Sequence, residues 1–69
     1  MTAMRIRVNG RDREVAPGAT VSALLEELGL LPARLAVERN GRVVAKPDYP
    51  SVALEEGDVV EVVHFVGGG

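Results

Sequence analysis

The chain has 69 residues with ten acidic and eight basic side chains, which indicates one small domain and leaves no room for a second. Its net charge of −2 argues against a nucleic-acid-binding protein, and the absence of cysteine, with a single histidine, excludes disulfides and most zinc sites. No apolar run approaches the roughly 20 residues that cross a bilayer, and no secretory leader precedes the first strand. We therefore expect a cytoplasmic protein with no contact to a membrane or to nucleic acid.

A β-hairpin is predicted at the start of the chain. Apolar side chains alternate with arginines from Met4 to Val8, which is typical of a strand with one buried face, and Asn9-Gly10 favours a two-residue type I′ turn. Two opposite-charge pairs on the exposed face support that register, Arg7 with Asp12 and Arg5 with Glu14. The same register places Arg13 beside Ile6 on the apolar face. We therefore expect the second strand to be short and to lie at an edge of the sheet.

A short amphipathic helix is predicted after the turn at residues 16–19. Thr20 is a candidate N-cap, Gly29 a candidate C-terminal cap, and Pro32 prevents the helix from resuming. The apolar stripe consists of Val21, Leu24, Leu25 and Leu28. Because this pattern covers only about two turns, the helix needs a sheet to pack against.

A second hairpin and a final strand complete the pattern. Leu35 and Val37 begin a third strand, Asn40-Gly41 repeats the turn signal, and residues 42–44 return as a fourth strand. After an irregular stretch and a tight turn at residues 56–58, the last strand extends from Val59 to Phe65. This order indicates an α+β protein of the β-grasp (ubiquitin-like) class, with four to five strands in a mixed sheet and one helix packed on one face. Residues 1–66 would form this single domain and residues 67–69 a flexible tail.

The three glycines at the end of the chain allow two interpretations. They are a frayed terminus, as last residues often are, or they are a reactive arm. Extended, Val66 and the glycines would reach on the order of 13 Å beyond the sheet, and without Cβ atoms they could enter a narrow channel in a partner enzyme. The terminal carboxylate would then become reactive once ATP-dependent adenylation gave it a good leaving group.

The last strand has an unusual distribution of apolar residues. Val60 and Val62 can face the core, while Glu61 marks the opposite side as exposed, yet Val63 and Phe65 share the side of Glu61. These are either scattered surface residues, which are common, or an apolar docking patch beside the tail.

The polar side chains give no sign of a catalytic site. His64 has no evident nucleophile or triad partner, so we interpret it as a surface or partner contact rather than an acid or base. The scattered basic residues are expected at turns and sheet edges, where they would block edge pairing rather than bind phosphate: Arg11, Arg13, Arg39, Arg42 and Lys46.

Three segments resemble the ThiS family, the sulfur carriers of thiamine biosynthesis. These are VERNGRVV (Val37 to Val44), EEGDVVEVVHFVGGG (Glu55 to Gly69) and the helix segment TVSALLEELGL (Thr20 to Leu30). The resemblance implies a protein cosubstrate rather than an enzyme. A ThiF-like adenylating enzyme would activate the Gly69 carboxylate with ATP, and sulfur drawn from cysteine through a desulfurase would convert it into a thiocarboxylate. That group would give its sulfur to a ThiG-like thiazole synthase, and the carrier itself would need no cofactor or metal.

The same resemblance assigns roles to the end of the chain. Gly69 would be the modified residue, Gly67 and Gly68 would thread into the partner's active site, and Val63, Phe65 and Val66 are assigned to partner docking by position. A Gly-Gly end alone equally fits a thiocarboxylate carrier for molybdopterin or tRNA thiolation, or a ubiquitin-like covalent modifier. A binding module with an inert tail is a further alternative.

Overall fold

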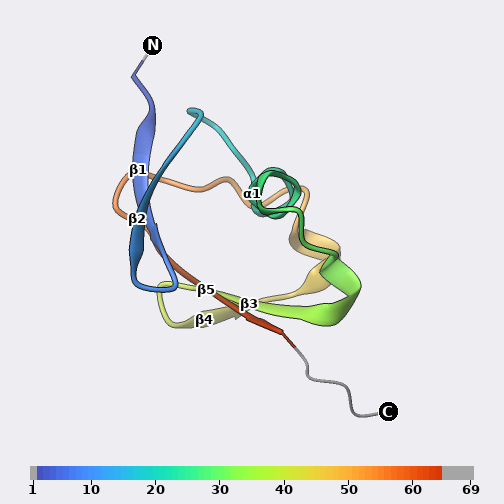
Figure 1. Cartoon of the computed structure of the whole chain (residues 1–69). Coiled ribbons are helices and arrows are strands. Elements are labelled where there is room, and N and C mark those ends of the chain that lie inside the picture. Colours follow the sequence, from blue (N-terminus) through green and yellow to red (C-terminus); the bar gives the residue numbers. More distant parts are fainter. Residues whose placement is uncertain (1, 65–69) are drawn as a thin grey trace.

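A five-stranded mixed sheet with one helix across one face makes up the protein in a computed structural model that describes residues 2–64 (Figure 1). The helix is α1 (Val21–Leu28), and two 3₁₀ turns, η1 (Pro32–Arg34) and η2 (Lys46–Asp48), lie in the connections. The strands are β1 (Met4–Val8), β2 (Arg11–Val15), β3 (Leu35–Arg39), β4 (Arg42–Val44) and β5 (Val59–His64), in the order β2-β1-β5-β3-β4. This arrangement confirms the expected β-grasp architecture.

Both hairpins turn at the Asn-Gly pairs. The φ angles are 49° and 82° at Asn9-Gly10 and 52° and 82° at Asn40-Gly41, positive at both positions as a type I′ turn requires. The predicted register of β1 and β2 is confirmed, including Arg13 opposite Ile6. β2 lies at the sheet edge as expected, but it is as long as β1, so the expectation of a short strand was wrong. Its far end is held because Val15 is buried in the core.

The helix begins and ends at the predicted caps. The Thr20 hydroxyl accepts a hydrogen bond from the Ala23 N–H at 3.1 Å, and Gly29 adopts a left-handed conformation with φ of 72°. The apolar stripe of the helix faces the sheet, with Val21, Leu24 and Leu25 buried. Packing against the sheet therefore supplies the stability that two isolated turns lack.

Strand β5 occupies the centre of the sheet. It runs parallel to β1 and antiparallel to β3, which confirms that the last strand lies beside the first. The core between sheet and helix is closed at its side by Tyr49 and Leu54 from the crossing segment. The other buried apolar side chains of the core come from the strands and the helix: Ile6, Val8, Val15, Val21, Leu24, Leu25, Leu35, Val37, Val60 and Val62. β1 pairs with β5 at Val59 and Val60, and β3 pairs with it up to His64, so β3 positions the strand where it ends.

Candidate functional site

The candidate functional site is the end of β5, where the chain leaves the sheet. The strand is described up to His64, and five further residues follow it in the sequence. The predictions for Phe65, Val66, Gly67, Gly68 and Gly69 lie outside the described residues. Five residues span at most roughly 17 Å when extended, so the position of β5 limits where the terminal carboxylate can go.

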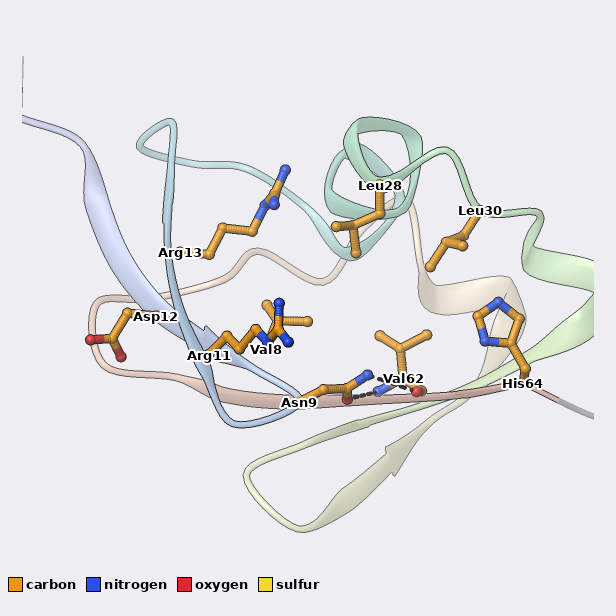
Figure 2. A pocket seen from close by; sticks show the side chains of 9 residues that line it. All are labelled: Val8, Asn9, Arg11, Asp12, Arg13, Leu28, Leu30, Val62 and His64. Atoms are coloured by element: carbon orange, nitrogen blue, oxygen red, sulfur yellow. Dashed lines mark hydrogen bonds between the residues drawn. The ribbon is translucent and has the colours of Figure 1, made fainter.

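The side chain of Asn9 holds β5 on one side. The Asn9 N–H donates to the Val60 carbonyl at 3.0 Å, as part of the parallel pairing. At Asn9 the backbone enters the turn, and the side-chain amide makes the next pair of hydrogen bonds to β5. Its Nδ2 donates to the Val62 carbonyl at 3.1 Å, and its Oδ1 accepts from the Val62 N–H at 2.8 Å (Figure 2). The side chain thus continues the ladder by one step towards the end of β5.

We predict that Asn9→Gly destabilises the fold by about 1–2 kcal/mol, because it removes two hydrogen bonds to Val62 while glycine still permits the positive φ of the turn. Urea denaturation measures this loss, and amide hydrogen exchange at Val62 is expected to accelerate beyond that global loss. Unchanged stability and unchanged exchange at Val62 would show that the amide is dispensable.

Asn40 holds the other end of β5 in the same way. Its N–H donates to the Val59 carbonyl at 2.7 Å, and its Oδ1 accepts from the Val59 N–H at 2.9 Å. Its Nδ2 donates to the Asp58 carboxylate at 3.0 Å. The two turn asparagines therefore fix both ends of the central strand. The sequence predicted these asparagines only as turn residues; the overlooked signal is that both turns begin with an asparagine, whose amide can imitate a backbone peptide group.

Asp58 is the buried polar centre of this end of the sheet. Its carboxylate accepts from Arg39 Nε at 2.7 Å, from Asn40, and from the Glu55 N–H at 2.8 Å. Arg39 flanks the Asn40-Gly41 turn, as predicted, but it does not lie at a sheet edge, because β3 lies between β4 and β5 and the guanidinium binds Asp58 just before β5. Burial by itself raises the pKa of Asp58, but the hydrogen bonds from Arg39, Asn40 and Glu55 outweigh it and hold this pKa below its ordinary value.

This lowered pKa predicts how stability depends on pH. Because the folded carboxyl has a lower pKa than the unfolded one, its contribution is complete above the unfolded value of 3.8 and is lost as the pH falls through the folded value. We expect the free energy of unfolding to decrease below about pH 4. In Asp58→Asn, measured by urea denaturation across the same range, that decrease should be smaller; an identical slope would assign the acid sensitivity to other groups.

The two faces of β5 differ as the alternation predicted. Val60 and Val62 are buried, whereas Val59 and Val63 are 47% and 52% exposed on the face away from the helix. Val63 lies opposite Ala36 of β3, so this surface is apolar near the end of the strand. The exposure of Val63 fits a docking residue, although its role stays a prediction.

His64 lies on the helix side of β5, where it lines an open groove of about 430 Å³. Figure 2 shows its imidazole pointing towards Leu30, with Val62 beside it. The groove lies between the end of α1, the β1–β2 hairpin and the end of β5, and its lining residues are Val8, Asn9, Arg11, Asp12, Arg13, Leu28, Leu30, Val62 and His64. Since no serine, cysteine or lysine lines it, the groove offers the imidazole no nucleophile.

Residues 2–64 contain neither a candidate metal site nor a helix that could span a membrane. This part of the chain holds no group of three His, Cys, Asp or Glu side chains that could bind a metal ion. Its helices are too short and too polar for any of them to cross a membrane.

The sequence profile of the ThiS family matches residues 6–69, which is nearly the whole chain and includes its last residue. The chain belongs to the ThiS family. Relatives of known function agree: it is 38% identical to the sulfur carrier protein ThiS of Bacillus subtilis, over 93% of this chain and 98% of that protein. It is 47% identical to a thiazole synthase of Magnetococcus marinus, over 96% of this chain. This ThiS-family chain spans only 20% of the length of that thiazole synthase.

Solved structures agree with the fold of this ThiS-family chain. The crystal structure of the thiamine biosynthesis protein ThiS from Geobacter metallireducens has a TM-score of 0.82 at 35% identity, covering 96% of this chain and 100% of that one. A computationally designed protein based on human erythrocytic ubiquitin has a TM-score of 0.52 at 20% identity, covering 100% of this chain and 98% of that one. The second likeness concerns the fold alone, and it agrees with the ubiquitin-like class.

Proposed function

We propose that this chain is a sulfur carrier of thiamine biosynthesis whose reactive group is the carboxylate of Gly69. The observation that carries the proposal is the match to the ThiS family, which extends to Gly69 itself. The structure supplies a physical basis for delivery, since β3 and Asn40 hold one side of β5 from Val59 to His64 while β1 and Asn9 hold its other side from Val59 to Val62. The folded part of the chain would provide the surface that partner proteins bind.

The chemistry requires activation by another protein. A carboxylate resists nucleophilic attack until one oxygen becomes a good leaving group, and attack of that oxygen on the α-phosphorus of ATP, with release of pyrophosphate, gives an acyl adenylate. The terminal sulfur of a persulfide, the form in which a desulfurase carries sulfur, then displaces AMP to give an acyl disulfide, and a thiol cleaves its S–S bond, which releases the thiocarboxylate and leaves a disulfide. The residues 2–64 provide no phosphate-binding loop and no nucleophile beside His64, so a ThiF-like adenylating enzyme would perform the first step and a cysteine desulfurase would supply the sulfur. These partners and ATP would place the carrier in the cytoplasm.

A thiazole synthase is the proposed acceptor of the sulfur. This chain aligns with a fifth of the length of each of two thiazole synthases, so we expect it to take part in the reaction that those enzymes catalyse. This relationship favours a ThiG-like acceptor over the acceptors of molybdopterin or tRNA thiolation.

The proposal is tested by intact mass spectrometry. The chain is incubated with the adenylating enzyme of the same genome, ATP, cysteine, a desulfurase and a thiol reductant that cleaves the acyl disulfide. One oxygen atom is expected to be exchanged for sulfur, and the product should support thiazole formation by the thiazole synthase. Omitting ATP is the control, since it should leave the mass unchanged. A wild-type chain that never gains sulfur would contradict the proposed function, and higher-mass conjugates with other proteins would indicate a covalent modifier instead.

A further inference from the structure

The groove beside the end of β5 is bordered by three elements: the end of α1, the first hairpin and the end of β5 (Figure 2). α1 ends at Leu28, while β5 continues to His64 beyond the turn of the first hairpin. Val8 and Val62 form the floor of the groove, and Leu28 and Leu30 form its helix-side wall (Figure 2). The hydrogen bonds between Asn9 and Val62 fix the floor, so the groove is formed before any partner binds.

Basic side chains stand at the rim of this groove, against the overall charge of the chain. Arg11 and Arg13 lie on the helix side of β2, because the register pairs them with Val8 and Ile6. The one acidic residue in the lining is Asp12, whose carboxylate points away from the groove and pairs with Arg7, while the whole chain carries a net charge of −2 (Figure 2). The groove therefore combines an apolar floor with a basic rim, which suits an acidic partner.

The two arginines also have N–H donors with no acceptor within residues 2–64. Arg13 has one acceptor among residues 2–64, the Glu27 carboxylate at 3.4 Å from its Nη2, and its Nε is buried with no hydrogen-bond partner there. A buried donor without an acceptor costs about 1–3 kcal/mol. Arg11 is exposed, and its guanidinium makes no hydrogen bond or ion pair within the described part of the chain. The fold itself makes little use of these two charges.

We propose that this basic groove is a docking site for an acidic, apolar segment of the enzyme that activates the Gly69 carboxylate. Carboxylates of that segment would pair with Arg11 and Arg13, and an apolar side chain would pack on Leu28 and Leu30. The inference rests on the proposed function, because the groove ends at His64, five residues before the group to be activated. An enzyme that binds the groove would hold the carrier next to the last five residues, which its active site must receive.

The test is Arg11→Glu with Arg42→Glu as its matched control. Both arginines are exposed and each is the first strand residue after an Asn-Gly turn, but Arg42 lies on β4, away from the groove. In adenylation kinetics, Arg11→Glu is expected to raise the KM for the carrier by about tenfold or more with kcat unchanged, and Arg42→Glu to leave both unchanged. Added salt should raise the wild-type KM towards that of Arg11→Glu. Arg13→Gln should raise the KM in the same direction.

Direct binding separates this inference from the proposed function. Calorimetric titration of the adenylating enzyme with each carrier variant, in the absence of ATP, should give a Kd at least about tenfold weaker for Arg11→Glu than for Arg42→Glu. If both variants bind like the wild type, the groove is not the docking site, even if sulfur loading proceeds. If the wild type binds with the expected dependence on Arg11 but is never loaded, the proposed function fails while the docking site stands. Thermal unfolding of each variant checks that it is folded.

Discussion

Replacing the terminal carboxylate of Gly69 by a carboxamide is expected to abolish sulfur loading and to leave the thermal unfolding midpoint unchanged. Only one oxygen of the chain is altered, but the amide cannot attack ATP as a carboxylate does, so no acyl adenylate forms. The contacts that define the core, the helix caps and the strand pairing lie within residues 2–64, so stability should not respond. A chain of 69 residues is accessible to chemical synthesis, and the unmodified synthetic chain is the control.

Shortening the chain is a second test of whether the Gly69 carboxylate is the reactive group. The last three residues are identical, so removing any one of them gives the same molecule, which still ends in Gly-Gly. Removing two glycines leaves a single one and shortens the arm by roughly 7 Å, which takes the carboxylate out of reach of a site built for the longer arm. Loading is expected to fall by at least about a hundredfold after the double deletion and by less after the single one. A carboxamide or doubly shortened chain that still gains sulfur would exclude Gly69 as the reactive residue.

Local sequence chemistry was sufficient to predict most elements of the fold. The Asn-Gly pairs, the Thr20 cap and the helical stripe each act within a few residues, and each formed where it was expected. The exposure of Val63 followed from the alternation of a single strand. These features need no knowledge of which strands are neighbours.

The features that failed prediction depend on neighbours distant in sequence. Arg39 flanks a turn as expected, but its contact with Asp58 follows only from the position of β3 beside β5. In the same way, the Asn9 amide can bind Val62 only because the parallel pairing places β5 beside the first turn. The basic groove is lined by residues of the first hairpin, α1 and β5, which are distant in sequence, so no local pattern could predict it.

Asp58→Ala is expected to cost about 3 kcal/mol of unfolding free energy, the largest loss for any single polar substitution among residues 2–64. Its removal leaves the Arg39 guanidinium without its closest carboxylate, at 2.7 Å, and leaves the Asn40 amide and the Glu55 N–H without their acceptor. A domain of this size has a total stability of only several kcal/mol, about 0.05–0.15 kcal/mol per residue, so this loss would be a large part of it.

Asp12→Ala provides the matched control for that loss. Asp12 also pairs with an arginine, Arg7, but at 3.4 Å and with both side chains more than half exposed, so its removal should cost less than about 1 kcal/mol. Urea denaturation of the two variants at neutral pH gives the comparison. Because Asp58 lies at the foot of β5, its variant should also increase amide exchange at Val59, whose carbonyl and N–H are held by Asn40. If the two substitutions cost the same, burial of Asp58 adds nothing to its ion pair, and the strand that leads to the C-terminus must be held by its backbone pairing alone.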